Sequence, residues 1–246
     1  ALDSQRFEMV LQPKMDLQTN SVIAAEALVR WRLEDGTYLP PSSFVNIFEK
    51  NRFCSKLDFY MLKKAILQIR EWIDMGMEPV NISVNQSKIV FYHENYISEL
   101  KSLLEKYNVS GSYITLEVLE STVIEDIDMF NSILTEVKKL GFSVSLDDFG
   151  SGYSSLNVLS KLQIDELKID RIFLHTKSEV DNQRTKWILE SIIEIAKKSQ
   201  ILVVVEGVES KQDDLFIKSL GADVGQGYFY GRPLSISAFN DLIETK

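Results

Sequence analysis

Residues 201–206 read Ile-Leu-Val-Val-Val-Glu, a continuous apolar run that ends in a carboxylate. Five apolar residues are far too few to cross a bilayer, which takes about 20. Branched apolar residues in an unbroken run are typical of a strand covered on both faces, as in a parallel sheet flanked by helices. The run therefore predicts an α/β fold, with Glu206 at the carboxyl end of a strand.

Strand-like and helix-like segments alternate throughout the rest of the chain. The predicted strands are Phe7–Pro13, Val22–Trp31, Pro79–Asn85, Tyr113–Val118, Phe142–Leu146, Glu166–Ile169, Ile201–Val205 and Val224–Gly225. The predicted helices are Ser42–Lys50, Asp58–Met75, Asn95–Tyr107, Asp126–Leu140, Ser154–Lys161, Asp181–Ser199, Lys211–Leu220 and one that Ser235 opens. About eight strand–helix units in 246 residues fit one α/β barrel. The short turn between the first two strands predicts an antiparallel hairpin.

The composition excludes several classes of protein. With 45% hydrophobic and 10% aromatic residues, the chain is too apolar to be disordered. Its 27 basic and 36 acidic residues give a formal charge of −9, so we expect no nucleic-acid polymer as a partner. No signal peptide opens the chain, and we expect no membrane contact by this domain. One cysteine and two histidines are too few for a thiolate or imidazole metal site, so a bound metal would have oxygen ligands.

Polar side chains collect where the predicted strands end. They are Glu26 within the second strand, then Asn85, Glu117, Asp147, Asp148, Lys168, Glu206 and Gln226 at successive strand ends. In a barrel, the ends of all parallel strands open onto one face, where active sites are built. Several carboxylates in one pocket repel one another unless cations lie between them. The pattern therefore predicts an all-oxygen site for two divalent cations, an arrangement that serves in-line phosphoryl displacement.

Each of these residues also has a simpler interpretation. Asp147 and Asp148 could cap a following helix and supply charge to its first turn. Lys168 could be a charge on an edge strand, and Glu206, which precedes Gly207, could be a turn residue. The set as a whole, rather than any single member, favours the metal site.

In order along the chain, these residues resemble the EAL domain, a family of bacterial cyclic di-GMP phosphodiesterases. The resemblance covers essentially the whole chain and rests on Glu26-Ala27-Leu28-Val29-Arg30-Trp31, Val84-Asn85-Gln86-Ser87, Leu116-Glu117-Val118-Leu119-Glu120-Ser121, Asp147-Asp148-Phe149-Gly150-Ser151-Gly152-Tyr153, Leu167-Lys168-Ile169-Asp170, Val205-Glu206-Gly207-Val208-Glu209-Ser210 and Gln226-Gly227-Tyr228-Phe229. It implies a modified TIM (β/α)8 barrel with one antiparallel strand near the N-terminus. It also implies two Mg²⁺ or Mn²⁺ ions, inhibition by Ca²⁺, and hydrolysis of one phosphodiester bond of cyclic di-GMP to linear 5′-pGpG.

The resemblance implies roles for single residues. The implied metal ligands are Glu26, Asn85, Glu117, Asp147, Asp148 and Glu206, and the implied catalytic residues are Lys168, Glu26 and Gln226. Asn81 also fits the pattern around the asparagine, but Asn85 has the family spacing of 32 residues to Glu117. The positions that match substrate contacts are Gln12, Pro13, Arg30, Asp170 and Pro233. Those that match the loop after the aspartates, or the residues that steady the ligands, are Glu120, Phe149, Gly150 and Glu209.

Lys168 is expected to act on the attacking water. The charged form of a lysine beside two cations is disfavoured, so its pKa should fall and a base role becomes available. Three residues depart from the family pattern: Leu119 stands where threonine is usual, Val205 where alanine is common, and Lys14 where an apolar residue is usual. None of these departures removes an implied ligand.

We expect residues 1–246 to form one domain, excised from a longer signalling protein, that acts in the cytoplasm as a homodimer. The full-length protein could be anchored in a membrane. Two other functions remain open: a receptor or interaction module of the same fold with little or no turnover, and a barrel that acts on another phosphate ester. Receptors of this kind generally lose a metal carboxylate or the loop motif, and this chain retains them, which favours the enzyme.

Overall fold

The structure is a computed structural model, which describes residues 6–50, 53–120, 127–150, 156–174 and 179–244. Its strands are β1 (Phe7–Asp16), β2 (Ser21–Arg32), β3 (Tyr38–Leu39), β4 (Asn81–Gln86), β5 (Ile114–Leu119), β6 (Ser143–Phe149), β7 (Glu166–Ile169), β8 (Leu202–Val205) and β9 (Val224–Gln226). Its α-helices are α1 (Val45–Lys50), α2 (Cys54–Asp74), α3 (Lys88–Phe91), α4 (Tyr96–Tyr107), α6 (Ile127–Lys139), α7 (Leu156–Lys161), α8 (Glu179–Lys198), α9 (Lys211–Ser219) and α10 (Ile236–Glu244). Short 3₁₀ segments are η1 (Pro41–Ser43), η2 (Gly111–Tyr113) and η3 (Arg171–Phe173).

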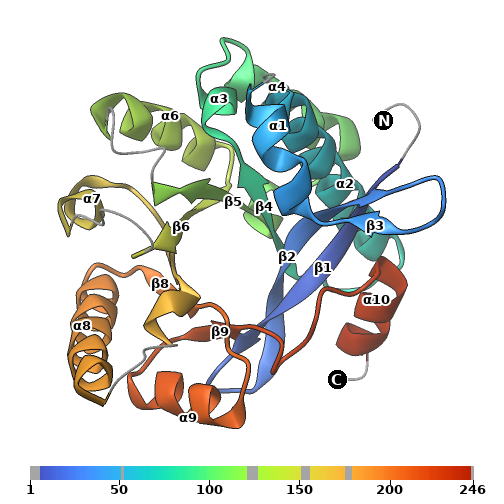
Figure 1. The fold of residues 1–246 in the computed structure, drawn as a ribbon. Helices are drawn as coiled ribbons and strands as arrows, with labels where there is room; N and C mark the ends of the chain where they lie inside the picture. The colour runs from blue at the N-terminus through green and yellow to red at the C-terminus, as the bar shows by residue number, and fades with distance from the viewer. Residues whose placement is uncertain (1–5, 51–52, 121–126, 151–155, 175–178, 245–246) are drawn as a thin grey trace.

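Eight strands close into a barrel, with the helices arranged around it (Figure 1). The strand order is β1-β9-β8-β7-β6-β5-β4-β2, and β1 also pairs with β2, which closes the ring. β1 runs antiparallel to both β2 and β9, whereas the other barrel pairs are parallel. The predicted α/β barrel with one antiparallel strand near the N-terminus is therefore confirmed.

All eight predicted strands are present, with ends that differ by a few residues. The sequence did not predict β3 or α3, because segments of two and four residues are too short to show a period. β6 continues past the predicted Leu146 as far as Phe149, which brings both aspartates into the strand. Among the described helices, none is long and apolar enough to cross a membrane.

The two faces of the barrel strands have opposite character. In β5, Ile114, Leu116 and Val118 belong to the hydrophobic core between the sheet and the helices, whereas Thr115 and Glu117 are buried polar residues on the other face. This is the period of two that a strand imposes on its side chains. The inner face of many such barrels is filled by branched apolar residues. Here much of the inner face is polar, as Thr115, Glu117, Glu166 and Lys168 show.

A charged contact outside the barrel holds β9, the strand that carries Gln226. The Tyr230 hydroxyl donates to Asp214 Oδ1 over 2.9 Å, and Lys218 Nζ lies 2.9 Å from the same oxygen. The Tyr230 ring covers Gly225, where a Cβ atom would fall 2.5 Å from the ring. β9 is therefore held from outside the barrel interior, because Asp214 and Lys218 of α9 fix the Tyr230 ring over Gly225.

Candidate active site

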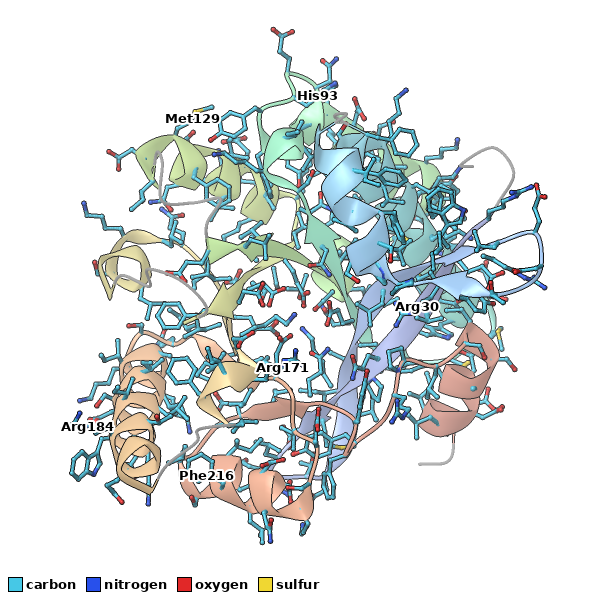
Figure 2. The ribbon with its side chains drawn as sticks, viewed as in Figure 1. Arg30, His93, Met129, Arg171, Arg184 and Phe216 are labelled. Carbon is cyan, nitrogen blue, oxygen red and sulfur yellow. The ribbon has the colours of Figure 1, made fainter. Side chains whose placement is uncertain are left out.

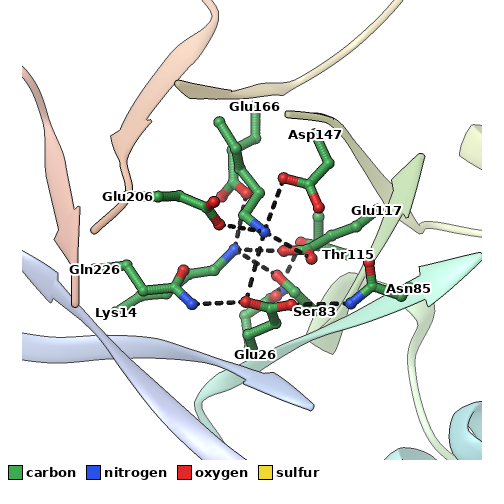
Figure 3. A network of polar contacts seen from close by, with 12 residues as sticks. Lys14, Glu26, Ser83, Asn85, Thr115, Glu117, Asp147, Glu166, Glu206 and Gln226 are labelled. Carbon is green, nitrogen blue, oxygen red and sulfur yellow. Dashed lines mark hydrogen bonds and ion pairs between the residues drawn. The ribbon is translucent and has the colours of Figure 1, made fainter. Parts of the chain in front are cut away.

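Side chains from six strands meet inside the barrel at the carboxyl ends of the parallel strands. They are Glu26 of β2, Glu117 of β5, Asp147 of β6, Lys168 of β7, Glu206 directly after β8 and Gln226 of β9. Figure 3 shows these carboxylates pointing inward from separate strands toward one point. The closed barrel thus brings together residues that are up to 200 positions apart, as the contact between Glu26 and Gln226 shows.

Lys168 lies at the centre of this ring. Its side chain is 1% exposed, and its Nζ lies 2.7 Å from Glu206 Oε1, 2.9 Å from Glu117 Oε2, 3.0 Å from Asp147 Oδ1 and 3.5 Å from Glu26 Oε2. β7 lies between β6 and β8, so the interpretation of Lys168 as an edge charge is wrong. One ammonium group therefore neutralises part of the charge of four carboxylates, of which Glu26, Glu117 and Asp147 are buried and Glu206 is partly exposed.

The pKa values show that the carboxylates around Lys168 outnumber the positive charges that could neutralise them. Burial, together with neighbouring carboxylates, raises the pKa of Asp147 to about 7 and raises those of Glu26 and Glu206. Burial lowers the pKa of Lys168, but the four carboxylates outweigh it and raise that pKa well above its ordinary value. The predicted fall in the pKa of Lys168 assumes cations beside it and stays a prediction, since the side chains by themselves raise this pKa. A buried, mutually repelling set of acids is stabilised by a divalent cation.

Asp147 and Asp148 reach the site together because β6 is irregular. Adjacent side chains of a regular strand point to opposite faces, yet oxygens of Asp147, Asp148 and Glu206 all lie within 4.8 Å of one another. The β6–β7 pairing shifts register after Leu146, and Asp148 has φ of +56°, a left-handed conformation that aspartate tolerates better than most residues. Both aspartates belong to β6, which continues to Phe149, so neither caps a helix and the helix-cap interpretation is wrong.

Two amides hold Glu26 from either side. Gln226 Nε2 donates to Glu26 Oε2 over 2.6 Å, and Asn85 Nδ2 donates to Glu26 Oε1 over 2.9 Å. Among the described residues, buried Gln226 Oε1 has no hydrogen-bond partner, which leaves an acceptor beside the carboxylates. Asn81 instead accepts from Thr115 Oγ1 and donates to the backbone of Ser112. Of the two asparagines, the structure places Asn85 beside the carboxylate ring.

The carboxylate ring opens into a cavity of about 340 Å³. The cavity is lined by Gln12, Glu26, Asp147, Asp148, Lys168, Arg171, Glu206, Gly207, Glu209, Gln226, Gly227 and Tyr228. Its donors are carboxylate and amide oxygens, which suit Mg²⁺, Mn²⁺ or Ca²⁺. His93 lies at the outer edge of the molecule (Figure 2), and His175 lies outside the described residues. The chemistry of these donors therefore fits the oxygen-ligated cations that the sequence predicts.

Gln12 and Pro13 of β1, and Pro233, are expected substrate contacts that lie where residues 231–234 pass alongside β1. Leu11 pairs with Leu234, and Gln12 Nε2 donates to the backbone oxygen of Gly231 over 3.2 Å. A Cβ atom at Gly231 would fall 2.7 Å from the ring of Pro13. Gln12, Pro13 and the segment that contains Pro233 therefore lie close together at the edge of the cavity.

The other two expected substrate-contact residues lie on opposite sides of the carboxylate ring, Arg30 on β2 and Asp170 directly after β7. The Arg30 guanidinium is half-buried, which lowers its pKa, and it interacts with the charges of Tyr228 and Glu26. Asp170 caps η3 by accepting from the Ile172 amide over 2.7 Å, and its charge adds to the burial that raises the pKa of Asp148. Arg30 thus supplies a cation, and Asp170 an anion, beside the site.

The residues that the sequence assigns to the loop have different environments. Glu120 and Phe149 are buried, whereas Glu209 is exposed and lines the cavity. Gly150 has φ of +96°, and a Cβ atom there would fall 2.1 Å from the Phe173 ring. The predicted loop residues 151–155 lie outside the described residues. The positioning roles of Glu120 and Glu209 stay predictions.

Residues 1–233 match the EAL domain family. The chain belongs to this family. Among curated relatives of this EAL domain, the bifunctional diguanylate cyclase/cyclic di-GMP phosphodiesterase MucR of Pseudomonas aeruginosa is 32% identical over 95% of this chain and 34% of its own length. Cyclic di-GMP phosphodiesterase PdeR of Escherichia coli is 30% identical over 97% of this chain and 36% of its own length. The EAL domain described here thus spans about a third of these relatives.

Solved structures share the barrel of this EAL domain. The PaMucR phosphodiesterase in a c-di-GMP complex has a TM-score of 0.89 at 32% identity, over 97% of this chain and 96% of that chain. The EAL enzyme Bd1971, in a form with cAMP and cyclic di-GMP bound, has a TM-score of 0.89 at 28% identity, over 98% of this chain and 65% of that chain. The EAL family name comes from the Glu26-Ala27-Leu28 segment of β2, whose glutamate lies in the carboxylate ring.

Sequence reasoning missed several polar residues at the site of this EAL domain. Arg171 and Tyr228 line the cavity, and Lys14 and Glu166 lie buried inside the barrel. The signal for the last two is the strand period: Lys14 lies two residues after Gln12, and Glu166 lies two residues before Lys168. Side chains two apart on a strand share a face, so both could have been placed inside the barrel.

The contact between Gly150 and Phe173 generates a first prediction. Gly150→Ala should destabilise the fold, because the new Cβ meets the Phe173 ring and the left-handed backbone costs an L-residue about 1–2 kcal/mol. The change should also weaken Mn²⁺ binding, because Asp148 lies two residues away. Urea unfolding and calorimetric titration with Mn²⁺ measure the two effects.

Gly36→Ala is the matched control, because Gly36 has a similar φ of +84° but open space around its Cβ position. It should show the backbone cost alone and leave Mn²⁺ affinity unchanged. Equal losses of stability and equal Mn²⁺ affinities in the two variants would show that the contact with Phe173 does not position the aspartates.

Proposed function

We propose that this EAL domain hydrolyses one phosphodiester bond of cyclic di-GMP and releases linear 5′-pGpG. The observation that carries the proposal is the ring of buried carboxylates around Lys168 at the floor of an open cavity. The names of the relatives support it, since MucR and PdeR are called cyclic di-GMP phosphodiesterases. The PaMucR phosphodiesterase, which has the same barrel, was solved as a c-di-GMP complex. Cyclic di-GMP is a second messenger of bacterial cells, so the proposed place of action is the cytoplasm.

The residues that would hold two Mg²⁺ or Mn²⁺ ions are Glu26, Asn85, Glu117, Asp147, Asp148 and Glu206. The inward convergence of these residues, the raised pKa values of Glu26, Asp147, Asp148 and Glu206, and the oxygen-rich donor set support this assignment. When bound, two divalent cations supply the charge that activates water and stabilises the attacking and leaving oxygens of an in-line displacement. Glu209 would steady this set from the edge of the cavity.

The chain's own residues place the water and the phosphate. In hydrolysis the water oxygen bonds to phosphorus, the bond from phosphorus to the 3′ oxygen breaks, and one water proton ends on that oxygen. Gln226 Oε1 is an acceptor that can hold the water, and Lys168 Nζ lies among the same carboxylates. Lys168 is charged while it alone neutralises them, so its base role requires that their charge is shared with cations.

The groups around the mouth of the cavity would bind the rest of the substrate. Arg30 offers a guanidinium, which suits phosphate oxygens, and Gln12 offers an amide. Asp170 can accept hydrogen bonds from a guanine base. Pro233 is partly exposed at the edge, and Pro13 is buried against Gly231 beside it. The receptor alternative is disfavoured, because every carboxylate that turnover would need is present and points into one site.

The metal requirement gives a second prediction. EDTA should abolish hydrolysis of cyclic di-GMP by the 246-residue chain, and Mg²⁺ or Mn²⁺ should restore it, because carboxylate oxygens are the main donors at the site. Ca²⁺ should inhibit, since its longer bonds and looser geometry misplace the attacking water. Chromatography of the nucleotide products measures all three. Full activity in EDTA would exclude the two-metal assignment.

Substitutions of Lys168 and Arg30 should distinguish an effect on the chemical step from an effect on substrate binding. Lys168→Ala should keep its affinity for cyclic di-GMP, measured with Ca²⁺ to prevent turnover, and lose about 10²–10⁴-fold in kcat, as is typical for a positioned acid–base group. Arg30→Ala should instead raise KM more than it lowers kcat, because Arg30 would contact the substrate in the ground state as well. Near-normal kcat in Lys168→Ala would remove that residue from the mechanism.

We also propose that the domain works as a homodimer. Three large apolar side chains on η3 and α8 are more than half exposed, namely Ile172, Trp187 and Ile188. A contiguous patch of exposed apolar side chains is typical of an interaction surface, so the proposal requires that these three share one face of the domain. These elements follow the strand that carries Lys168, so dimer contacts would be coupled to the site through the β7 end.

We propose that the dimer also acts on the site through the loop after Asp148, and Glu120 tests this coupling. Glu120→Ala should lower activity and Mn²⁺ affinity without any contact with substrate, because a buried carboxylate next to the site would no longer steady the loop. Glu136→Ala, an exposed glutamate on α6, is the control and should behave as wild type. Activity assays, Mn²⁺ titration and sedimentation give the readouts. A monomer that is fully active at all concentrations would contradict the role of the dimer.

A further inference from the structure

Lys14 is a buried cation that the proposed chemistry does not use. It belongs to β1, the antiparallel strand, and its side chain is 1% exposed. Its Nζ lies 2.7 Å from Ser83 Oγ, 2.8 Å from Glu166 Oε1 and 2.9 Å from Glu117 Oε1. An ammonium group has three protons to donate, and each of these acceptors can take one. Lys14 therefore has a complete set of partners without contact with solvent.

Glu117 lies between two lysines. Its Oε1 accepts from Lys14 and its Oε2 accepts from Lys168, each over 2.9 Å (Figure 3). The plane of the carboxylate is therefore fixed at both oxygens. Lys14 approaches from the closed interior of the barrel, whereas Lys168 belongs to the ring at the cavity floor. The two lysines thus hold the same carboxylate from different sides.

Glu166 balances the charge of Lys14. The glutamate is buried on β7, two residues before Lys168, and contacts Lys14 over 2.8 Å. Lys14 and Glu166 together add no net charge beneath the carboxylate ring, so they do not weaken its attraction for cations. Buried ion pairs of this kind are often no more stabilising than apolar residues of the same volume. A gain in folding stability therefore does not explain why β1, β4 and β7 place Lys14, Ser83 and Glu166 inside the barrel.

We propose that Lys14 is a positioning residue, which fixes the Glu117 carboxylate for metal binding, and that Glu166 and Ser83 hold Lys14 in place for that task. This inference rests on the proposed function, in which Glu117 is a metal ligand. Lys14 touches neither substrate nor metal; it acts through Glu117. Residues that orient a metal ligand typically contribute about 10–100-fold to metal affinity.

The direction in which Mn²⁺ affinity changes when Lys14 is replaced distinguishes a positioning role from a purely electrostatic one. Lys14→Met removes a positive charge from beneath the carboxylate ring, so electrostatics alone would make Mn²⁺ bind more tightly. Loss of positioning would make it bind more weakly. The double variant Lys14→Met/Glu166→Gln removes one charge of each sign, so the net charge stays constant and any change in affinity reports positioning. Removing both charges also avoids an unpaired buried carboxylate at position 166.

The experiment is calorimetric titration of Mn²⁺ into the 246-residue chain and its variants, with folding checked by circular dichroism and urea unfolding. The double variant should bind Mn²⁺ about 10–100-fold more weakly than wild type. Lys218→Met is the matched control, because Lys218 also pairs with a buried carboxylate, Asp214, but outside the barrel interior, and Asp214 keeps Lys211 and Tyr230 as partners that hold β9. It should lose stability and keep its Mn²⁺ affinity.

Each outcome bears on one claim. Wild-type Mn²⁺ affinity in the folded double variant, or tighter binding in Lys14→Met, would overturn the positioning role. If the double variant does not fold, Ser83→Ala decides: a weaker Mn²⁺ affinity supports the role, because this change removes one of the contacts that fix Lys14, and an unchanged affinity overturns it. Glu117→Gln should bind Mn²⁺ poorly; wild-type affinity in that variant would instead overturn the assignment of Glu117 as a ligand in the proposed function.

Discussion

The contact between one buried ammonium group and four carboxylates, at Lys168, is the constraint on which the site depends. Charges removed from water are costly unless each has partners, and partners of opposite sign are few here. Glu117 receives two lysines, and its pKa falls to about 2, because both cations outweigh the effect of burial. Asp147, Glu26 and Glu206 share Lys168 and have raised pKa values. The ring therefore retains a surplus of acid that divalent cations can neutralise.

The barrel interior is therefore largely polar, whereas many barrels of this kind fill it with branched apolar residues. The apolar residues of β5 and β7 face outward and pack beneath the helices, while the inward positions carry Thr115, Glu117, Glu166 and Lys168. Closure by the antiparallel β1 brings Lys14 into the same interior, between strands that are distant in sequence. The stability of the fold comes mainly from the outer layer, which leaves the interior free to hold charge.

The sequence was sufficient to predict the barrel, because the strand-like runs and helical periods are clear, and it was sufficient to place polar residues at strand ends. It could not show how Asp147 and Asp148 both reach the site, since that depends on a register shift and a left-handed residue that no local pattern encodes. It also missed the partners of Lys14, because contacts across 69 to 152 residues arise only when the barrel closes. The fall expected for the pKa of Lys168 depends on cations that share the carboxylates, whereas the side chains by themselves raise that pKa.

The central claim is that these carboxylates form a two-metal site. Anomalous diffraction from crystals of this chain grown with Mn²⁺ tests it most directly, because the signal locates the metal without assuming its ligands. Two Mn²⁺ peaks about 3.5–4 Å apart are expected, surrounded by Glu26, Asn85, Glu117, Asp147, Asp148 and Glu206. An interior without any peak, or Mn²⁺ bound only at carboxylates on the outer surface, would contradict it.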